Sequence, residues 1–197
     1  MVAKYTQTDE QAKRDKHIMR IKSSVSNLTD LLNEFLSIGK IEDGKVMAHM
    51  VAFNIKELLE TICNELQTIA KPGQTIGLTH TGVAFVTLDP SLLRNVLINL
   101  LSNAIKFSPE GGLISVASAT KENCITLRVK DSGMGISAED QEHLFERFFR
   151  GKNATNIQGT GLGLHIVSKY IELMNGQINF ESELEKGTEF IITFNLA

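Results

Sequence analysis

Two asparagines and a lysine are spaced so that one helix face would carry all three. Asn99 and Asn103 are four residues apart, and Lys106 follows three residues later, within the segment LLRNVLINLLSNAIKF. Residues at these intervals share a face of a helix, and the apolar residues between them supply the opposite, buried face. Amide oxygens can complete the shell of Mg²⁺, and an ammonium group can meet phosphate charge. The spacing therefore indicates a site for an oxygen-rich anion, although asparagine and lysine also line the solvated faces of many helices.

A second group of chemically suited residues lies at the end of a predicted strand, in the segment VKDSGMGI. Asp131 ends the strand, and Gly133 and Gly135 allow the backbone to turn tightly and to approach a flat ligand. A carboxylate in that position can accept a hydrogen bond from an exocyclic amine, such as the 6-amino group of adenine. A simple turn at the end of a strand would explain the same residues without a ligand.

A glycine-rich segment, GTGLGL, places Gly159, Gly161 and Gly163 directly before a predicted helix that carries His165. Backbone N–H groups at a helix N-terminus, together with the helix dipole, form a ready anion site. The glycine spacing differs from the dinucleotide-binding fingerprint, and the segment lacks the Gly-Lys-Ser/Thr of a Walker loop.

Aromatic residues followed by a polar stretch lie between the two glycine-containing segments, in LFERFFRGKNATNIQ. Phe145, Phe148 and Phe149 would form an apolar anchor, and the polar residues after them would form a mobile segment. A lid over a nucleotide needs this combination. The same phenylalanines fit equally well as part of an ordinary core.

The elements that must position these residues begin with a long helix predicted over residues 8–39. Thr8 and Gln11 have the spacing of a capping box, and Gly39 is a plausible stop. Apolar residues recur along this helix at the alternating three- and four-residue intervals of a heptad stripe. Such a stripe indicates packing against another helix in a bundle or a second chain, or else packing against its own domain. The stripe consists of Ile18, Ile21, Val25, Leu28, Leu32 and Phe35.

After a polar, turn-like stretch at residues 41–45, strands and helices alternate along the chain. A helix is expected to begin at Asn54, paired with Glu57, and another at Asp89 and Pro90, which are an N-cap and a first-turn proline. The hairpin-like strand pairs favour a mixed or antiparallel sheet with helices on one face. Strands are expected over residues 46–53, 75–79, 83–88, 113–119, 124–129, 177–182 and 188–195, and a last helix over residues 162–174.

The composition is that of an ordinary globular protein of 197 residues, with 42% hydrophobic and 22% charged residues. Twenty basic and 23 acidic residues give a net charge of -3, which disfavours binding to nucleic acid or to an anionic membrane surface. No apolar run reaches the length of a membrane span, so the chain is expected to be soluble and cytoplasmic. Cys63 and Cys124 are expected to be reduced, buried residues.

The ordered set of motifs is much more specific than any one of them. An Asn-x-x-x-Asn helix, then DSGMG, FERFF, GTGLGL and the KGT that contains Thr188 strongly resembles the ATP-binding catalytic domain of sensor histidine kinases. These belong to the GHKL ATPase superfamily, and the resemblance covers most of residues 83–194. It implies an α+β fold, in which a two-layer α/β sandwich of a mixed sheet backed by three helices follows the long helix of a helical-bundle dimerisation domain.

The resemblance also assigns roles to individual residues. Asn99 and Asn103 would hold Mg²⁺, Lys106 would act on the phosphates, and Asn99 and Lys106 would be the catalytic pair. Phe107 would pack on the adenine and Asp131 would bind its amino group. The residues implied in binding ATP are Asn103, Phe107, Asp131, Gly133, Gly135, Ile136, Arg150, Lys152, Gly159, Thr160, Gly161, Leu162, Gly163, Leu164 and Thr188.

By the same resemblance, residues 1–42 are part of a dimerisation and histidine-phosphotransfer hairpin, mainly its second helix, and residues 43–197 are the catalytic domain. The phosphoacceptor of this family lies in a motif of the form His-Glu-x-x-Thr-Pro, which none of the five histidines matches. The acceptor helix is therefore expected to be absent from this chain, which would then bind Mg-ATP but hardly autophosphorylate. His165 is expected to be structural.

Two other functions remain open at this stage. GHKL ATPases of the gyrase, chaperone or mismatch-repair kind share the glycine motifs, but they carry a glutamate base at the place of Asn99, and an asparagine cannot accept a proton from water. A non-catalytic nucleotide-sensing dimerisation module is the second alternative. For the kinase, the resemblance implies a response regulator receiver domain as a partner and a homodimer in the full-length protein.

Overall fold

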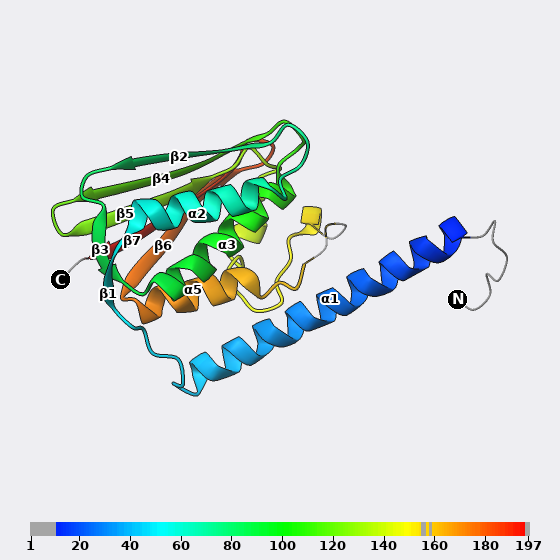
Figure 1. Cartoon of the computed structure of the whole chain (residues 1–197), viewed down its shortest axis with the longest axis horizontal. Helices are drawn as coiled ribbons and strands as arrows, with labels where there is room; N and C mark the ends of the chain where they lie inside the picture. Colours follow the sequence, from blue (N-terminus) through cyan, green and yellow to red (C-terminus); the bar gives the residue numbers. More distant parts are fainter. Residues whose placement is uncertain (1–10, 155–156, 158, 196–197) are drawn as a thin grey trace. The chain divides into compact units, whose positions relative to one another are not determined.

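The computed structural model describes residues 11–154, 157 and 159–195, and the chain divides into two units, one up to Asp43 and one from Gly44 (Figure 1). The boundary predicted from the sequence lies one residue earlier. The assignment of the two units to a dimerisation domain and a catalytic domain stays a prediction.

The first unit contains one long helix, α1 (Gln11–Glu42). The predicted heptad stripe lies on this helix, and its six side chains are all exposed, from Ile18 at 38% to Leu28 at 66%. The predicted capping box includes Thr8, which lies outside the described residues. The stripe therefore forms an exposed apolar surface along α1.

The predicted end of this helix at Gly39 is wrong. The helix continues through Gly39 to Glu42, and the Asp43 N–H donates to the Gly39 carbonyl at 3.0 Å. Glycine inside a helix costs only about 1 kcal/mol relative to alanine, so it does not by itself end one. The left-handed residue that follows the helix is Gly44, with a φ of 65°. It fits the position after a helix C-terminus where glycine is favoured.

The second unit begins with a shorter strand than predicted. The sequence indicated a strand over residues 46–53, but β1 spans Val51–Asn54. It pairs antiparallel with β3 (Phe85–Leu88) in a separate two-stranded sheet. Helix α2 (Ile55–Gln67) follows at once, and its N-cap Asn54 accepts a hydrogen bond from the Glu57 N–H while donating to the Glu57 side chain. The capping residues predicted for this helix are therefore confirmed.

The main sheet has five strands in the order β2-β4-β5-β7-β6. The β2 and β4 strands pair in parallel, and the other neighbours pair antiparallel, so the predicted mixed sheet is confirmed. The strands are β2 (Thr75–Thr81), β4 (Leu113–Lys121), β5 (Cys124–Lys130), β6 (Gly176–Glu183) and β7 (Gly187–Asn195).

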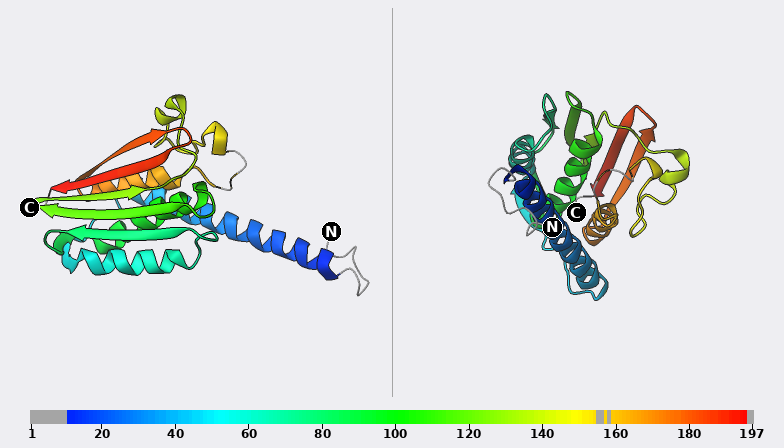
Figure 2. Two further views of the ribbon diagram at one scale, coloured as in Figure 1. Left: turned by 90° about the horizontal axis from the view of Figure 1, so that it is seen from above. Right: turned by 90° about the vertical axis from the view of Figure 1, so that its right-hand side faces the viewer.

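Helices α2, α3 (Pro90–Phe107) and α5 (Gly163–Leu173) cover one face of this sheet (Figures 1 and 2). Alternate residues of the central strands point into the core that lies between the sheet and the helices, as strand geometry requires. The fully buried side chains include Ile114, Ile125, Leu127 and Phe194 from the sheet, and Leu93, Leu97 and Leu101 from α3. Two short helices, α4 (Ala138–Gln141) and η3 (Lys152–Ala154), lie between β5 and α5.

Helix α3 carries three of the predicted site residues, and its start is held firmly. Asp89 accepts hydrogen bonds from the Ser91 and Leu92 N–H groups at 2.8 and 3.0 Å, and Pro90 occupies the first turn. The second Asp89 oxygen accepts from the His49 N–H at 2.8 Å. The predicted N-cap and first-turn proline are therefore confirmed.

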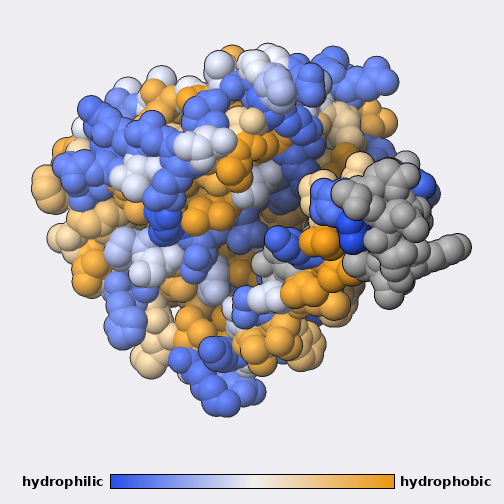
Figure 3. All heavy atoms as spheres, turned by 45° about the vertical axis from the view of Figure 1, so that its right-hand side comes forward, coloured by the Kyte–Doolittle hydropathy of each residue, from blue (hydrophilic) through white to orange (hydrophobic). Residues whose placement is uncertain are grey.

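None of the described helices is long and apolar enough to span a membrane. On the face drawn in Figure 3, hydrophilic and hydrophobic side chains are interspersed. Both cysteines are free thiols, with Cys63 buried and Cys124 half-buried.

Candidate nucleotide-binding site

At one end of the sheet, the inner face changes from apolar to polar across three strands. Asp131 comes directly after β5, two residues beyond the buried Val129, and its N–H donates to the Thr188 carbonyl of β7 at 2.9 Å. Thr188 in turn pairs with Ser182 of β6. Because side chains alternate along a strand, Asp131, Thr188 and Ser182 form one polar row that faces the helices.

The environment of the Asp131 carboxylate explains its electrostatics. Its Oδ1 accepts hydrogen bonds from the Gly133 N–H at 2.8 Å and the Thr188 N–H at 3.3 Å. Burial raises the pKa of this carboxyl above its ordinary value, and the two backbone N–H groups lower it by a smaller amount. Two backbone donors thus compensate only part of the lost hydration. A carboxylate in this state gains from a further hydrogen-bond donor.

The turn after Asp131 passes very close to the β6–β7 hairpin. Gly135 has a φ of 66°, and a Cβ built on it would lie 2.0 Å from the Glu183 carbonyl oxygen. A Cβ on Gly133 would lie 2.7 Å from Asp131 Oδ1 and 3.0 Å from the Phe107 carbonyl oxygen. The two glycines predicted from the sequence therefore allow this turn to contact both the hairpin and the end of α3.

Ser182 is a site residue that the sequence reasoning missed. Its Oγ accepts a hydrogen bond from the Ile136 N–H at 2.9 Å, and it lies 3.1 Å from the Gly187 carbonyl and 2.9 Å from Thr188 Oγ1. Gln141 Nε2 donates to the carbonyls of both Ile136 and Ser182. The inward position of Ser182 next to the KGT motif was the available signal.

The polar face of α3 meets the glycine-rich segment. A Cβ built on Gly163 would lie 2.7 Å from Asn99 Oδ1, and a Cβ built on Gly159 would lie 3.0 Å from Lys106 Nζ. The Asn99 side-chain nitrogen donates to the Asn95 carbonyl at 3.0 Å, which leaves its oxygen turned toward the segment. The structure thus brings Asn99 and Lys106 to the loop that the sequence assigned to anion binding.

Five further predicted residues lie around these groups. Asn103 lies one turn from Asn99 on α3 and is partly exposed. The Lys106 Nζ atom lies 5.4 Å from the centroid of the Phe107 ring. Thr160 Oγ1 accepts a hydrogen bond from the Leu162 N–H at 3.1 Å, which orders the loop before α5. Leu162 is buried and Leu164 is half-buried, so both anchor the start of α5.

Two residues outside every predicted motif hold the end of α3. Lys71 Nζ donates to the carbonyls of Lys106 and Ser108 at 2.7 and 2.6 Å. Gln74, which is buried, places its Nε2 within 3.2 Å of the carbonyls of Ile105, Ser108 and Pro109. A helix C-terminus leaves carbonyls without intrahelical partners, and these side chains satisfy several of them. They therefore fix the backbone at Lys106 and Phe107.

The two cations predicted in the lid bond to the protein itself. Arg150 donates to the Ala154 carbonyl at 2.9 Å and to the Ile157 carbonyl, and Lys152 pairs with Glu139 at 2.9 Å. The hydrogen bond from Lys152 to Glu139 raises the pKa of the lysine. Asn153 Nδ2 donates to the Gly135 carbonyl at 3.1 Å, which ties this segment to the turn after Asp131.

The aromatic residues of the same region divide into two kinds. Phe145 packs edge-on against Phe180 of β6, with ring centroids 5.9 Å apart. Phe148 is 60% exposed, and its N–H donates to the Gly161 carbonyl at 2.9 Å. His165 bonds through Nδ1 to the Phe145 carbonyl at 3.0 Å, which fits the predicted structural role of this histidine.

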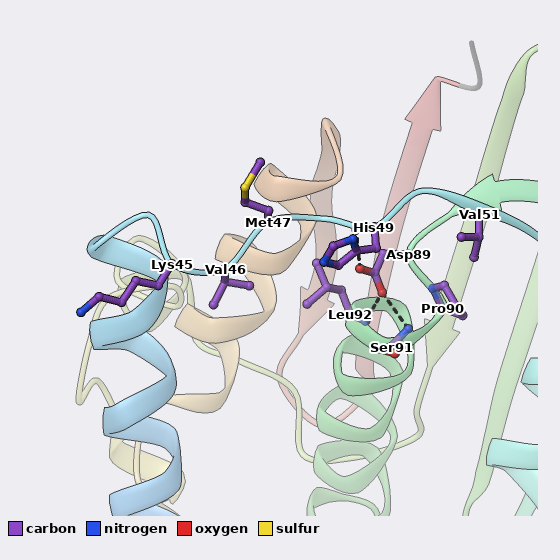
Figure 4. Close-up of a pocket in the computed structure, with 9 residues that line it drawn as sticks. All are labelled: Lys45, Val46, Met47, His49, Val51, Asp89, Pro90, Ser91 and Leu92. Atoms are coloured by element: carbon purple, nitrogen blue, oxygen red, sulfur yellow. Dashed lines mark hydrogen bonds between the residues drawn. The ribbon is translucent and has the colours of Figure 1, made fainter.

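A hollow lies at the other end of α3, near its N-terminus (Figure 4). Asp89 is one of the residues that line it, and its carboxylate oxygens accept hydrogen bonds from backbone N–H groups, as the dashed lines show. None of the residues predicted to bind the nucleotide lines it. The lining residues are Lys45, Val46, Met47, His49, Val51, Asp89, Pro90, Ser91 and Leu92.

Comparisons with known proteins agree with this arrangement. Residues 88–197 match the family described as histidine kinase-, DNA gyrase B-, and HSP90-like ATPase. Sensor protein GacS of Pseudomonas syringae pv. syringae is 36% identical over 185 residues, which are 89% of this chain and 20% of that protein. The heme sensor protein HssS of Staphylococcus saprophyticus subsp. saprophyticus is 31% identical over 191 residues, 97% of this chain and 41% of that protein. The chain thus spans well under half the length of these relatives.

Solved structures are similar as well. The catalytic domain of the histidine kinase ThkA, in a nucleotide-free form, is 30% identical with a TM-score of 0.63, over 75% of this chain and 96% of that one. Full-length ShkA in complex with AMPPNP has a TM-score of 0.80 at 24% identity, over 100% of this chain and 41% of that one, which shows a shared fold. The chain belongs to the family of histidine kinase-, DNA gyrase B- and HSP90-like ATPases, and its ATPase domain is of the sensor histidine kinase type.

Proposed function

We propose that this chain binds Mg-ATP between α3, the turn after Asp131 and the glycine-rich segment, and that it transfers the γ-phosphoryl group to a histidine that this sequence does not contain. The observation that carries the proposal is a pair of close approaches, of Asn99 to Gly163 and of Lys106 to Gly159. An amide oxygen and an ammonium group there lie against glycine backbone at and before the start of α5. Backbone N–H groups at a helix N-terminus, beside an ammonium group, suit a chain of phosphates.

The adenine end of the proposed site is the polar row at the end of the sheet. The Asp131 carboxylate needs a donor beyond its two backbone partners, and the 6-amino group of adenine is one. Thr188 lies beside it, and Gly133 and Gly135 let the turn after Asp131 pack closely against the β6–β7 hairpin and the end of α3. We assign Phe107 to the ring face because its backbone borders the same turn.

A magnesium ion would fit the phosphate end. Asn99 and Asn103 offer neutral amide oxygens, and the described residues contain no cluster of three or more His, Cys, Asp or Glu side chains that would form a protein-only metal site. Mg²⁺ commonly binds through few protein ligands together with substrate phosphates. When bound, it would neutralise charge on the phosphates that react. Lys106 would add a fixed positive charge to the same end.

The chemistry of Asn99 favours phosphoryl transfer over hydrolysis. Its side-chain nitrogen donates to the Asn95 carbonyl, and an amide does not accept a proton at neutral pH. A water molecule attacking the γ-phosphate is oriented or activated by a suitable side chain in efficient ATPases. With an asparagine at this position, the site can hold and polarise ATP but activates water poorly.

The test is incubation of the chain with ATP labelled at the γ-phosphate, alongside calorimetric titration with ADP and Mg²⁺. We expect saturable binding, slow release of phosphate, and no acid-labile, base-stable label on the chain itself. Rapid phosphate release that ceases in the Asn99→Ala variant would show an ATPase instead. Absence of binding by the folded chain would contradict the proposal altogether and favour a non-catalytic module.

The partners and compartment of the whole protein are also proposals. A sensor histidine kinase passes its phosphoryl group to the receiver domain of a response regulator, and we propose the same here. The exposed stripe of α1 would form a helical bundle in a homodimer, because an apolar seam of this length favours association. Light scattering that shows a strict monomer at high concentration would contradict this. Because the domain would use ATP, we propose that it lies in the cytoplasm.

A further inference from the structure

The Ser182 hydroxyl connects three segments of the adenine end. It lies within 3.1 Å of the Ile136 N–H, the Gly187 carbonyl and the Thr188 hydroxyl. The Ile136 N–H follows the turn after Asp131, whereas Gly187 and Thr188 start β7. Ser182 is half-buried on the inner face of β6, where the neighbouring inward residue is Phe180. Because the neighbouring inward side chain is apolar, the Ser182 hydroxyl makes its hydrogen bonds to the other segments of the site.

The acceptor of the Ser182 hydroxyl proton determines whether the Thr188 hydroxyl can donate a hydrogen bond to a ligand. A serine hydroxyl has one proton to donate and two lone pairs. The Ile136 N–H takes one lone pair, so the proton is donated either to the Gly187 carbonyl or to Thr188 Oγ1. When Ser182 donates to Thr188 Oγ1, the proton of Thr188 is released for a ligand. When Ser182 donates to Gly187, Thr188 can donate to Ser182 and offers a ligand only its lone pairs.

The position of Asp131 determines whether an adenine base needs Thr188 as a donor or as an acceptor. The Thr188 N–H donates to Asp131 Oδ1 at 3.3 Å, so the carboxylate and the threonine are adjacent. Adenine presents a donor, its 6-amino group, with an acceptor on either side of it, the N1 and N7 atoms. A base whose amino group meets the carboxylate thus brings an acceptor to the neighbouring position, and Thr188 must act as a donor there.

We propose that Ser182 is a positioning residue that turns the Thr188 hydroxyl into a donor toward the N1 edge of adenine. The proposal rests on the proposed function, because it assumes that adenine binds to Asp131. Ser182 itself touches no ligand and acts through Thr188. Its loss removes the group that accepts from Ile136 and donates to Thr188. Without Ser182, neither the position of the Ile136 backbone nor the direction of the Thr188 hydroxyl proton is fixed by this hydrogen bond.

The experiment compares ADP with 1-deaza-ADP, in which a C–H group replaces the N1 acceptor. Calorimetry would measure both ligands on the wild-type chain and on the Ser182→Ala, Thr188→Val and double variants. We expect Ser182→Ala to weaken ADP binding about 5- to 20-fold, as loss of one hydrogen bond at a buried site does. Binding of 1-deaza-ADP should change less than about twofold. In the Thr188→Val background, Ser182→Ala should have no further effect on ADP.

Equal weakening of both ligands by Ser182→Ala would overturn the proposal, because it would show a role in stability alone. An undiminished effect of Ser182→Ala in the Thr188→Val background would overturn it too. Thermal unfolding of each ligand-free variant shows that it is folded, and Ser182→Cys gives the same comparison if the alanine variant unfolds. A wild-type chain that binds no ADP would instead contradict the proposed function.

Discussion

Replacing Asp131 by asparagine changes the charge and one functional atom of the adenine end. Asparagine is nearly the same size, and its Oδ1 can still accept the Gly133 and Thr188 N–H groups that now lie at 2.8 and 3.3 Å. The second oxygen, however, becomes an NH₂ group. A donor then faces the 6-amino group of adenine, which is also a donor.

The magnitude follows from these contacts. A hydrogen bond to a charged group contributes about 1.5–3 kcal/mol, and a buried donor without a partner costs about 1–3 kcal/mol. Together they predict a loss of about 2.5–6 kcal/mol. Because about 1.4 kcal/mol corresponds to a tenfold change, ADP affinity should fall at least about 50-fold.

The stability of the ligand-free chain should change in the opposite direction. Burial raises the pKa of Asp131, so folding favours the protonated carboxyl, and the ionised form lowers the free energy of unfolding at pH 7. Asp131→Asn removes that penalty, so the variant should be at least as stable as the wild type at pH 7. The difference should shrink as the pH falls through the raised pKa of Asp131 toward its ordinary value. If Asp131→Asn binds ADP more weakly but keeps its free energy of unfolding, Asp131 contacts the ligand and is not needed for the fold.

The assay is calorimetric titration with ADP and Mg²⁺ at pH 7, with thermal unfolding of the ligand-free proteins from pH 4 to 7. Asp89→Asn is the matched control, because Asp89 also accepts backbone N–H groups but lies at the other end of α3. It should leave ADP affinity within about twofold of the wild type, because asparagine keeps the N-cap and the change lies far from the proposed site. Its new NH₂ group would face the His49 N–H, so the free energy of unfolding should fall. If the folded Asp131→Asn variant binds ADP within threefold of the wild type, Asp131 is not the adenine acceptor.

Three further outcomes can be measured on the same chain. Lys106→Met should weaken ADP binding at least about tenfold in calorimetry while adenosine binding stays within twofold, because only the phosphates lose a charge partner. Gly135→Ala should lower the free energy of unfolding in urea by at least about 2 kcal/mol, since its Cβ would overlap the Glu183 carbonyl, whereas Gly111→Ala, also at positive φ but with open space around it, should cost less. Burial raises the pKa of the Cys63 thiol to about 11, so this thiol should react with a thiol reagent at pH 7.5 far more slowly than in urea. Equal effects of the two glycine variants, or fast Cys63 labelling in the native state, would contradict the packing described here.

Local sequence signals were sufficient for the elements whose causes are themselves local. Asp89 and Pro90 marked the start of α3, Asn54 and Glu57 marked the start of α2, and both caps have the predicted hydrogen bonds. The end of α1 was placed wrongly, because glycine within a helix weakens it only slightly, while the left-handed position that ends it belongs to Gly44. A glycine at the end of a helical pattern is therefore weaker evidence for a helix boundary than a capping residue whose hydrogen-bond partner can be identified.

The residues that hold the site together were beyond such reasoning. The hydrogen bonds described above for Ser182, Lys71 and Gln74 reach residues 5 to 46 positions away. The segments around Lys71 and Gln74 give no indication of these partners. Arg150 and Lys152 were predicted to bind ATP from the lid, and this stays a prediction. The sequence did not indicate their hydrogen bonds to nearby carbonyls and to Glu139.

The polar row at the end of the sheet is the reason why we propose the adenine site there and not elsewhere on the inner face. Toward the centre of the sheet, the apolar side chains of Val129 and Phe190 are buried against the helices. At the end of β5, the half-buried Asp131 carboxylate accepts hydrogen bonds from two backbone N–H groups, and burial raises its pKa, which disfavours the ionised form. In the proposed complex, the amino group of a flat base would supply a further donor to this carboxylate. Ligand binding would then offset part of the cost of the buried charge, so removing the charge should stabilise the empty domain while it weakens the complex.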